Sequence, residues 1–244
     1  MTIRIAMWSG PRNLSTAMMR SFGSRSDTFV SDEPFYGCFL KTTGADHPMR
    51  EEVIASMDCD WNSVMQTLRS DAPDGSPVWY QKHMWHHIGG PIGYEDFDDF
   101  RHAFLIREPE RMIASYLRKR EAAAFEDLGL ERQAEFFERE ADRHGHAPAV
   151  VDSNDVLSDP ADVLSKLCAA LGIPWDEAML RWATGRRDTD GVWAAHWYNS
   201  VEKSTGFGPP ETEPVELPAD AQRLADRCRP FYERLAAHRI EARR

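Results

Sequence analysis

The sequence predicts an α/β fold, a three-layer sandwich in which helices cover both faces of a central parallel sheet. Short apolar runs of strand type alternate along the chain with longer amphipathic stretches, and this alternation is typical of parallel sheets. The chain has 244 residues, of which 42% are hydrophobic and 28% are charged, a balance that allows a large buried core. No convincing linker, internal repeat or low-complexity tract interrupts it, so we expect a single domain over residues 1–244.

Five strands are expected where short apolar runs end in polar or turn-forming residues. They are Ile3–Trp8, Phe29–Ser31, Val78–Lys82, Ala103–Ile106 and Pro148–Asp152. In a parallel sheet the carboxyl ends of the strands meet at one edge, and ligands bind there. The residues that directly follow each strand are therefore the first candidates for a functional site.

Helices are expected where apolar residues recur at three- and four-residue spacing. These stretches are Leu14–Phe22, Glu51–Arg69, Leu128–His144 and Asp220–Ile240. Two further helices are expected to begin at Pro109 and at Pro160, because proline suits the first helical turn, and the second of them stops at Gly172. Proline and glycine predict loops over Ala72–Pro77 and Phe207–Pro218.

The charge balance excludes several classes of partner. Lys plus Arg is 29 and Asp plus Glu is 40, a formal net charge of −11, so non-specific binding to nucleic acid or to an anionic membrane is not expected. No apolar run reaches the roughly 18 residues of a membrane helix, and the first residues lack the pattern of a signal peptide. The four cysteines are scattered without a CxxC pair, which favours a reducing, cytoplasmic location.

The segment after the first predicted strand, Ser9–Thr16 (SGPRNLST), has the composition of an anion-binding loop. A strand, a tight turn and a helix N-terminus present free backbone N–H groups and the positive end of the helix dipole. Arg12 adds a fixed cation, and Ser15 and Thr16 add hydroxyl donors that suit a phosphate or sulfate. The alternative, purely structural interpretation of this loop is an ordinary turn between a strand and a helix, in which Ser15 caps the helix. The binding residues expected from this loop are Gly10, Pro11, Arg12, Asn13, Leu14, Ser15 and Thr16.

This loop is not the P-loop of nucleotide triphosphatases. That motif needs a second glycine followed by Lys and then Ser or Thr, whereas here Leu14 stands in place of the glycine and no lysine is present. The P-loop lysine serves the β- and γ-phosphates next to Mg²⁺. A loop with Arg12 therefore fits a single anionic group better than a triphosphate–Mg²⁺ complex.

A second candidate element follows the strand Ala103–Ile106. Arg107 comes at the carboxyl end of that strand, and Ser115 lies about two helical turns further along. We expect the chain to bend where it enters the helix, which brings the side chains of Arg107 and Ser115 to one anion. The structural interpretation is a surface arginine and a serine inside a helix, without a ligand.

Together the two elements resemble the sulfotransferases that use 3′-phosphoadenosine 5′-phosphosulfate (PAPS). In that family the 5′-phosphosulfate loop follows the first strand, and an Arg followed eight residues later by a Ser binds the 3′-phosphate, which is the spacing of Arg107 and Ser115. Val150–Glu177 resembles the family's strand, acidic turn and "DP" helix start. Trp193–Phe207 resembles its late nucleotide-proximal segment. The resemblance covers about residues 3 to 180 and implies the P-loop NTPase-like sulfotransferase fold.

The resemblance also implies roles for single residues. The loop after the first strand would hold the 5′-phosphosulfate, and Arg107 and Ser115 would hold the 3′-phosphate. Ser204 and Thr205, in the late segment, would contact the nucleotide. The implied donor is PAPS, without a metal, and the implied partner is a small-molecule acceptor.

Sulfuryl transfer needs a stabilised leaving phosphate and a base for the acceptor proton. Arg12 and the loop amides are the candidates for the first task. The resemblance implies a carboxylate base at Glu33 in several branches, with Asp32 as a competing choice. His83 is the other candidate, because Lys82 and His83 are similar to the Lys-Thr-His pattern of cytosolic sulfotransferases, although the threonine is missing. We expect Lys82 to contact the transferred sulfuryl group.

Two other patterns can be interpreted either structurally or functionally. His83, His86 and His87 have helical ligand spacing, but the glutamate of an HExxH zinc motif is absent and GGP follows at once, so we expect no metal. Trp193 and Trp197 predict either an acceptor pocket or core packing.

The sequence therefore predicts a cytoplasmic PAPS-dependent sulfotransferase acting on a hydroxyl or amine of a small molecule. A P-loop small-molecule kinase is one alternative, weakened by the missing Gly-Lys pair. A non-catalytic nucleotide-binding or interaction module on the same fold is the other. The class of the acceptor and the oligomeric state stay open at this point.

Overall fold

The fold is α/β, and the computed structural model describes residues 2–243. By density of internal contacts the chain forms two compact units. The first unit comprises the residues up to Met7, Thr16–Arg101 and Glu177–Gly206. The second unit comprises Trp8–Ser15, His102–Asp176 and the residues from Phe207 onward.

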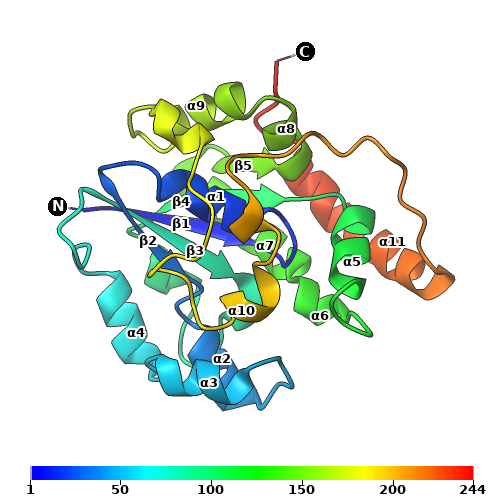
Figure 1. Ribbon diagram of the computed structural model, residues 1–244, viewed down its shortest axis with the longest axis horizontal. Helices are drawn as coiled ribbons and strands as arrows, with labels where there is room; N and C mark the ends of the chain where they lie inside the picture. Colours follow the sequence, from blue (N-terminus) through cyan, green and yellow to red (C-terminus); the bar gives the residue numbers. More distant parts are fainter. Residues whose placement is uncertain (1, 244) are drawn as a thin grey trace. The chain divides into compact units, whose positions relative to one another are not determined.

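All five predicted strands are present, and the sheet has the order β2-β3-β1-β4-β5 (Figure 1). The strands are β1 (Ile3–Ser9), β2 (Thr28–Asp32), β3 (Val78–Met84), β4 (Arg101–Ile106) and β5 (Ala149–Asp152). Strand β2 pairs in parallel with β3, with Thr28 opposite Val78, and β4 pairs in parallel with β5, with Ala103 opposite Ala149. Strand β3 is buried along its whole length, as expected for a strand covered on both faces, although Gln81, Lys82 and His83 are polar.

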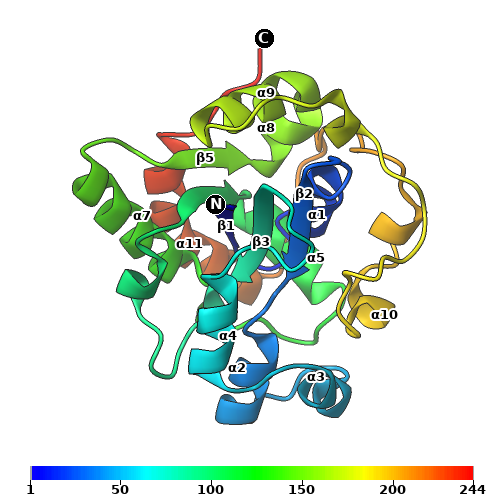
Figure 2. The same cartoon turned by 90° about the vertical axis from the view of Figure 1, so that its left-hand side faces the viewer.

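In the first unit one predicted helix proves to be two. The helix expected over Glu51–Arg69 is interrupted at Met57–Asp60, where the Asp60 carboxylate accepts the Ser63 N–H at 2.8 Å and caps a new helix. Figure 2 shows α2, which was not predicted, beside α3 and α4. The helices of this unit are α1 (Ser15–Phe22), α2 (Tyr36–Thr43), α3 (Arg50–Ser56), α4 (Trp61–Leu68) and α10 (Ala194–Trp197).

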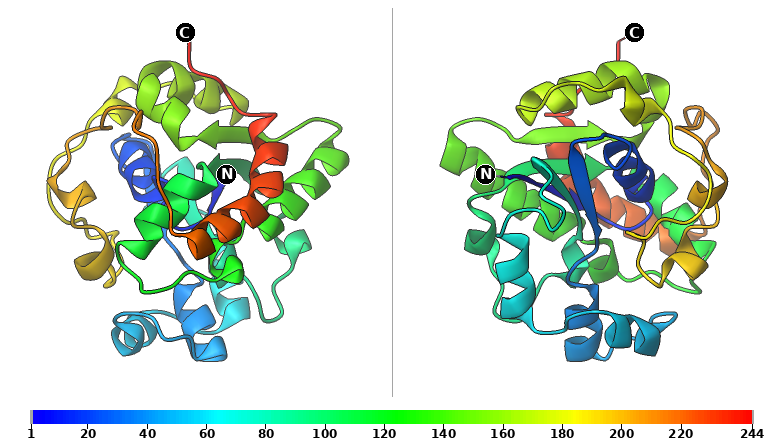
Figure 3. Two further views of the ribbon diagram at one scale, coloured as in Figure 1. Left: turned by 90° about the vertical axis from the view of Figure 1, so that its right-hand side faces the viewer. Right: turned by 60° about the vertical axis from the view of Figure 1, so that its left-hand side comes forward.

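In the second unit α11 packs along α5 and α7 (Figure 3). Met112 and Ile113 of α5 and Ala225 and Cys228 of α11 are fully buried in one hydrophobic cluster. Two prolines begin helices, as predicted, and residues 207–218 contain no helix or strand. The helices are α5 (Pro109–Leu117), α6 (Phe125–Leu128), α7 (Leu130–His144), α8 (Ser153–Ser158), α9 (Pro160–Ala170) and α11 (Ala219–Ala236).

Four short 3₁₀ helices complete the described part of the chain: Trp85–His87, Tyr94–Phe97, Glu177–Leu180 and Val201–Lys203. Within residues 2–243, none of the helices combines the length and apolar character that crossing a bilayer requires.

Candidate functional site

The loop between β1 and α1 has a backbone shaped to bind an anion. Arg12 and Leu14 have positive φ angles of 61° and 70°, whereas Pro11, Asn13 and Ser15 do not. Residues other than glycine rarely adopt such angles, and they cluster at ligand sites where the fold enforces them. When residues alternate between the left-handed and the right-handed backbone conformation, their successive N–H groups point into one concavity. Such a concavity, called a nest, binds anions.

Neighbouring elements of the second unit enforce this backbone. A Cβ atom added to Gly10 would lie 2.5 Å from the backbone oxygen of Leu128, so only glycine fits there. Asn13 is fully buried, and its backbone oxygen accepts the Ser153 hydroxyl at 2.9 Å. Its Nδ2 donates to the Leu105 oxygen at 3.4 Å, while its Oδ1 is buried without a hydrogen-bond partner. These hydrogen bonds thus hold the loop against β4 and α8, and Asn13 Oδ1 is the polar atom that they leave without a partner.

The two anion-binding elements predicted from the sequence meet in the second unit. Arg12 Nε donates to Ser115 Oγ at 3.2 Å, and Arg107 Nη1 donates to the backbone oxygen of Arg12 at 2.5 Å. Ser115 is 3% exposed on α5. Two guanidinium groups and a buried hydroxyl thus lie next to one another at the loop, and donors of these kinds suit an anion with more than one oxygen.

The Arg107 guanidinium already holds an anion from the chain itself. Its Nε donates to Glu211 Oε2 at 3.1 Å, and its Nη2 donates to Glu211 Oε1. The backbone N–H of Glu211 donates to Asn154 Oδ1 at 2.9 Å. This two-point contact shows that the guanidinium is oriented to receive a planar pair of oxygens.

In the first unit a buried lysine joins two carboxylates and a phenol. Lys82 is 1% exposed, and its Nζ donates to Asp32 Oδ1 at 2.8 Å, to Glu33 Oε1 at 2.7 Å and to Tyr198 Oη at 2.6 Å. Three ammonium hydrogens therefore have three acceptors. Burial alone would lower the Lys82 pKa, but the two carboxylates outweigh burial and raise that pKa well above its usual value. Lys82 is a permanent cation.

Glu33 has the properties of a general base. It follows β2, is 9% exposed, and has a φ angle of 47° that a side chain rarely tolerates. Burial raises the pKa of this carboxyl, and Asp32 adds to the rise, while Lys82 opposes it. A carboxylate whose pKa is raised accepts a proton more readily than a solvated one.

The second carboxylate oxygen of Glu33 faces a neutral histidine. Oε2 lies 3.4 Å from His87 Nδ1, a contact too poorly aligned to count as a hydrogen bond, since Nδ1 has no such partner. Burial lowers the His87 pKa well below its usual value, and its ring stacks on Tyr36 at 4.3 Å. The Oε2 atom of Glu33 is therefore not neutralised by a second cation.

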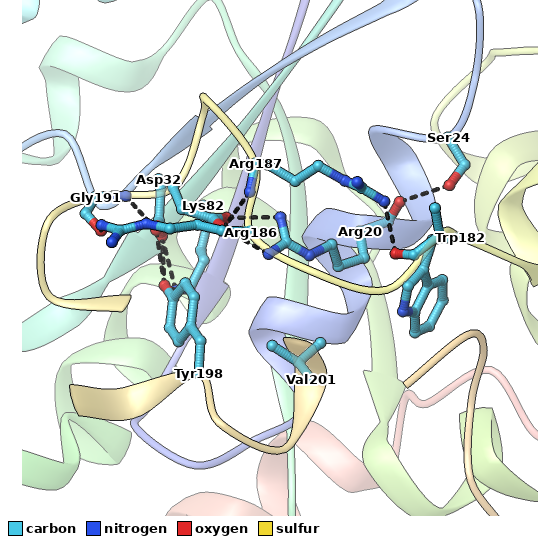
Figure 4. A network of polar contacts seen from close by, with 12 residues as sticks. Arg20, Ser24, Asp32, Lys82, Trp182, Arg186, Arg187, Gly191, Tyr198 and Val201 are labelled. Atoms are coloured by element: carbon cyan, nitrogen blue, oxygen red, sulfur yellow. Dashed lines mark hydrogen bonds and ion pairs between the residues drawn. The ribbon is translucent and has the colours of Figure 1, made fainter. Parts of the chain in front are cut away.

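Tyr198 belongs to this cluster and was not predicted from the sequence. Its hydroxyl donates to Asp32 Oδ2 at 2.7 Å and accepts from Lys82 Nζ (Figure 4). It also accepts from Trp193 Nε1 at 3.2 Å. Gly191 N–H also donates to Asp32 Oδ2, at 3.3 Å. Asp32 therefore anchors the segment that carries Tyr198, and the only sequence signal was the aromatic run around Trp193.

A second ion pair, between Arg20 and Asp190, fixes the same segment. Arg20 of α1 makes two hydrogen bonds of 2.6 Å with the Asp190 carboxylate, and these side chains are 3% and 0% exposed. The Asp190 carboxylate also accepts the Arg187 N–H at 2.8 Å. Residues 187–198 are thus held at both ends by buried polar contacts.

His83 directly follows Lys82 on strand β3. Neighbouring residues of a strand point to opposite faces, and His83 Nε2 lies 3.2 Å from Gln81 Oε1. The His83 ring lies among aromatic side chains, 5.5 Å from that of Phe97. Its alternative role as the base stays a prediction.

The remaining predicted residues have other surroundings. Ser204 Oγ accepts Trp182 Nε1 at 3.0 Å, and the backbone oxygen of Thr205 accepts the Trp182 N–H at 3.1 Å, all within the first unit. Their role in nucleotide binding stays a prediction. Although the rings of His86 and His87 lie 4.1 Å apart, no group of three or more metal-ligating side chains occurs among residues 2–243.

Comparison with known proteins identifies the family of the chain. The family model described as "Sulfotransferase domain" matches residues 3–239. Two Arabidopsis thaliana proteins, "Branched-chain-amino-acid aminotransferase-like protein 2" and "protein 1", are 35% and 37% identical to 96% of the chain. The chain spans only 41% and 42% of their lengths.

Solved structures share the fold. A sulfotransferase from Alicyclobacillus acidocaldarius has a TM-score of 0.58 at 16% identity, covering 98% of this chain and 97% of that one. The sulfotransferase domain from the curacin biosynthetic pathway has a TM-score of 0.55 at 17% identity, covering 93% and 97%. With the family match over nearly the whole sequence, these findings establish that the chain belongs to the sulfotransferase-domain family.

Proposed function

We propose that this chain is a PAPS-dependent sulfotransferase that acts on a hydroxyl or amine of a small-molecule acceptor. The observation that carries the proposal is the meeting of Arg12, Arg107 and Ser115 at the loop after β1. When bound, PAPS supplies the sulfuryl group and leaves as 3′-phosphoadenosine 5′-phosphate (PAP). Family membership supports sulfuryl transfer in general, and the two-part anion site favours this donor.

The residues of the second unit fit such a donor. The positive-φ backbone at Arg12 and Leu14 and the start of α1 would present N–H groups to a 5′-phosphosulfate. Pro11 has no N–H and serves by fixing its own φ angle. Arg107 and Ser115 would hold the 3′-phosphate. Groups that would surround the 5′-phosphosulfate are Gly10, Pro11, Arg12, Asn13, Leu14, Ser15 and Thr16.

The chain's own residues then perform two tasks. Arg12 and the loop amides stabilise the negative charge that develops on the departing phosphate. Glu33 accepts the proton of the acceptor hydroxyl. Because all three ammonium hydrogens of Lys82 are bound within the chain, we assign Lys82 to the orientation of Glu33 rather than to contact with the sulfuryl group.

Two wider features belong to the proposal. Because the family match spans 3–239, and therefore both units, we propose that the units work as a single sulfotransferase domain. The four cysteines are free thiols, which supports the cytoplasmic location that the sequence predicts. With a net charge of −11, we propose neither nucleic acid nor membrane as a partner.

Calorimetric binding of PAP, compared with ATP–Mg²⁺ and 5′-AMP, tests the function. We expect PAP to bind more tightly than both, and without metal. Tighter binding of ATP–Mg²⁺ would indicate a small-molecule kinase instead. Binding of PAP without turnover of PAPS on any acceptor in a broad screen would favour a non-catalytic module.

Replacing Arg107 with alanine should weaken PAP binding by about 2 kcal/mol, roughly thirtyfold, because a charge-assisted contact to phosphate is lost. Calorimetry with PAP and 5′-AMP measures the effect, which should be confined to PAP. Arg118→Ala, at an exposed position that ends α5, is the matched control. An unchanged PAP affinity in Arg107→Ala would remove the 3′-phosphate from this site.

A further inference from the structure

We propose that Glu211 is a built-in competitor of the donor's 3′-phosphate, so that PAP and PAPS bind only when this carboxylate leaves Arg107. The inference rests on the proposed function, because it assigns the ligand of Arg107 to the donor. It concerns the strap, which we define as residues 207–218 of the second unit. Glu211 would thereby set the affinity for the donor and its preference for a 3′-phosphate.

The contact itself is that of a phosphate mimic. Arg107 directs Nε and Nη2 at the two oxygens of one carboxylate, and the same fork of donors binds phosphate oxygens. The Arg107 side chain is 11% exposed, whereas that of Glu211 is 34% exposed. The arginine is thus built into the site at the end of β4, and the glutamate is the partner with room to leave.

Besides this ion pair, the strap makes contacts through its backbone and through Leu217. The Glu211 N–H donates to Asn154 Oδ1, and the backbone oxygen of Glu213 accepts Arg111 Nη2 at 3.0 Å. Leu217 packs against the hydrophobic cluster of α5 and α11. Four prolines, at positions 209, 210, 214 and 218, remove backbone donors that could tie the strap down. Release of the Glu211 carboxylate requires no helix or strand to break.

Charge makes the two ligands of Arg107 exclusive. With Glu211 in place the guanidinium is neutralised, and a 3′-phosphate brought to it would meet a carboxylate of the same sign. The apparent donor affinity is then the intrinsic affinity reduced by the fraction of molecules in which Arg107 is open. A ligand without a 3′-phosphate does not need this opening, so its affinity is independent of Glu211.

The test is calorimetry of Glu211→Gln with PAP and with 5′-AMP, because glutamine keeps the shape of the side chain and removes its charge. We expect PAP to bind about fivefold more tightly than to the unmodified protein, the scale of a partly exposed ion pair, and 5′-AMP to bind equally to both. Glu213→Gln, at an exposed position of the same strap, should leave both affinities unchanged. Asn154→Ala loosens the strap without a change of charge and should also tighten PAP binding.

The outcomes separate this inference from the proposed function. If neither the unmodified protein nor Glu211→Gln binds PAP, the proposed donor is wrong. Equal PAP affinities in the two proteins would overturn the inference and leave the donor in place. Weaker PAP binding by Glu211→Gln would show that Glu211 assists the donor, and equal tightening by Glu213→Gln would reduce the effect to net charge; either result overturns the inference.

Discussion

Replacing Glu33 with glutamine is expected to reduce turnover at least a hundredfold while PAP affinity stays nearly unchanged. Glutamine retains an oxygen for Lys82 but cannot accept the acceptor's proton, and removal of a general base costs about two orders of magnitude or more. Burial raises the Glu33 pKa, so the activity of the unmodified protein should fall as the pH drops through that raised value. A PAPS transfer assay across pH, with calorimetry of PAP, measures both effects.

The pH profile distinguishes loss of the base from a general disturbance. In Glu33→Gln the remaining activity should no longer show the acidic limb that Glu33 imposes. His83→Gln is the matched comparison, since His83 was the alternative base and lies among aromatic rings next to Gln81. Full activity in Glu33→Gln together with inactivity of His83→Gln would transfer the role of the base to His83.

The strands were predictable because each contains a short apolar run, whereas some helices depend on tertiary contacts. Helix α2 contains Gly37 and ends in two threonines, residues with weak helix propensity. A Cβ at Gly37 would lie 2.9 Å from the Cβ of Met57, so packing against the turn between α3 and α4 holds this helix. The interruption at Met57–Asp60 depends on the Asp60 cap, a local signal that the helical spacing of the flanking residues concealed.

The residues of the candidate site also divide into those that the sequence indicates and those that depend on tertiary contacts. The meeting of Arg12, Arg107 and Ser115 follows from signals in the sequence, because Arg12 lies in the loop after β1, Arg107 directly follows β4 and Ser115 repeats a known spacing. The partners Glu211 and Tyr198 were not, since they reach Arg107 and Lys82 across 104 and 116 residues of sequence, and spacing carries no information about such distant pairs. The two-residue period of a strand does predict that Lys82 and His83 face apart.

Replacing Lys82 with methionine should lower the free energy of unfolding by about 3 to 5 kcal/mol, the cost of leaving buried charges without their partner. Methionine preserves much of the volume of the lysine stem, so a cavity contributes little. The loss leaves Asp32 and Glu33, both less than 10% exposed, as neighbouring carboxylates. Denaturant unfolding measures the change, and Lys41→Met, at an exposed position of α2, should stay within about 0.5 kcal/mol.

The loss of unfolding free energy in Lys82→Met, called the deficit below, should depend on pH in a defined direction. Without the ammonium, the pKa of Glu33 rises further above its unfolded value, because Lys82 is the group that lowers it. A carboxyl whose folded pKa exceeds its unfolded pKa makes the folded state less stable as pH rises through that interval. The deficit should therefore be larger at pH 8 than at pH 5, and Lys82→Met with Glu33→Gln should recover part of it. The same deficit at both pH values would mean that Lys82 stabilises the fold through packing rather than by neutralising the two carboxylates.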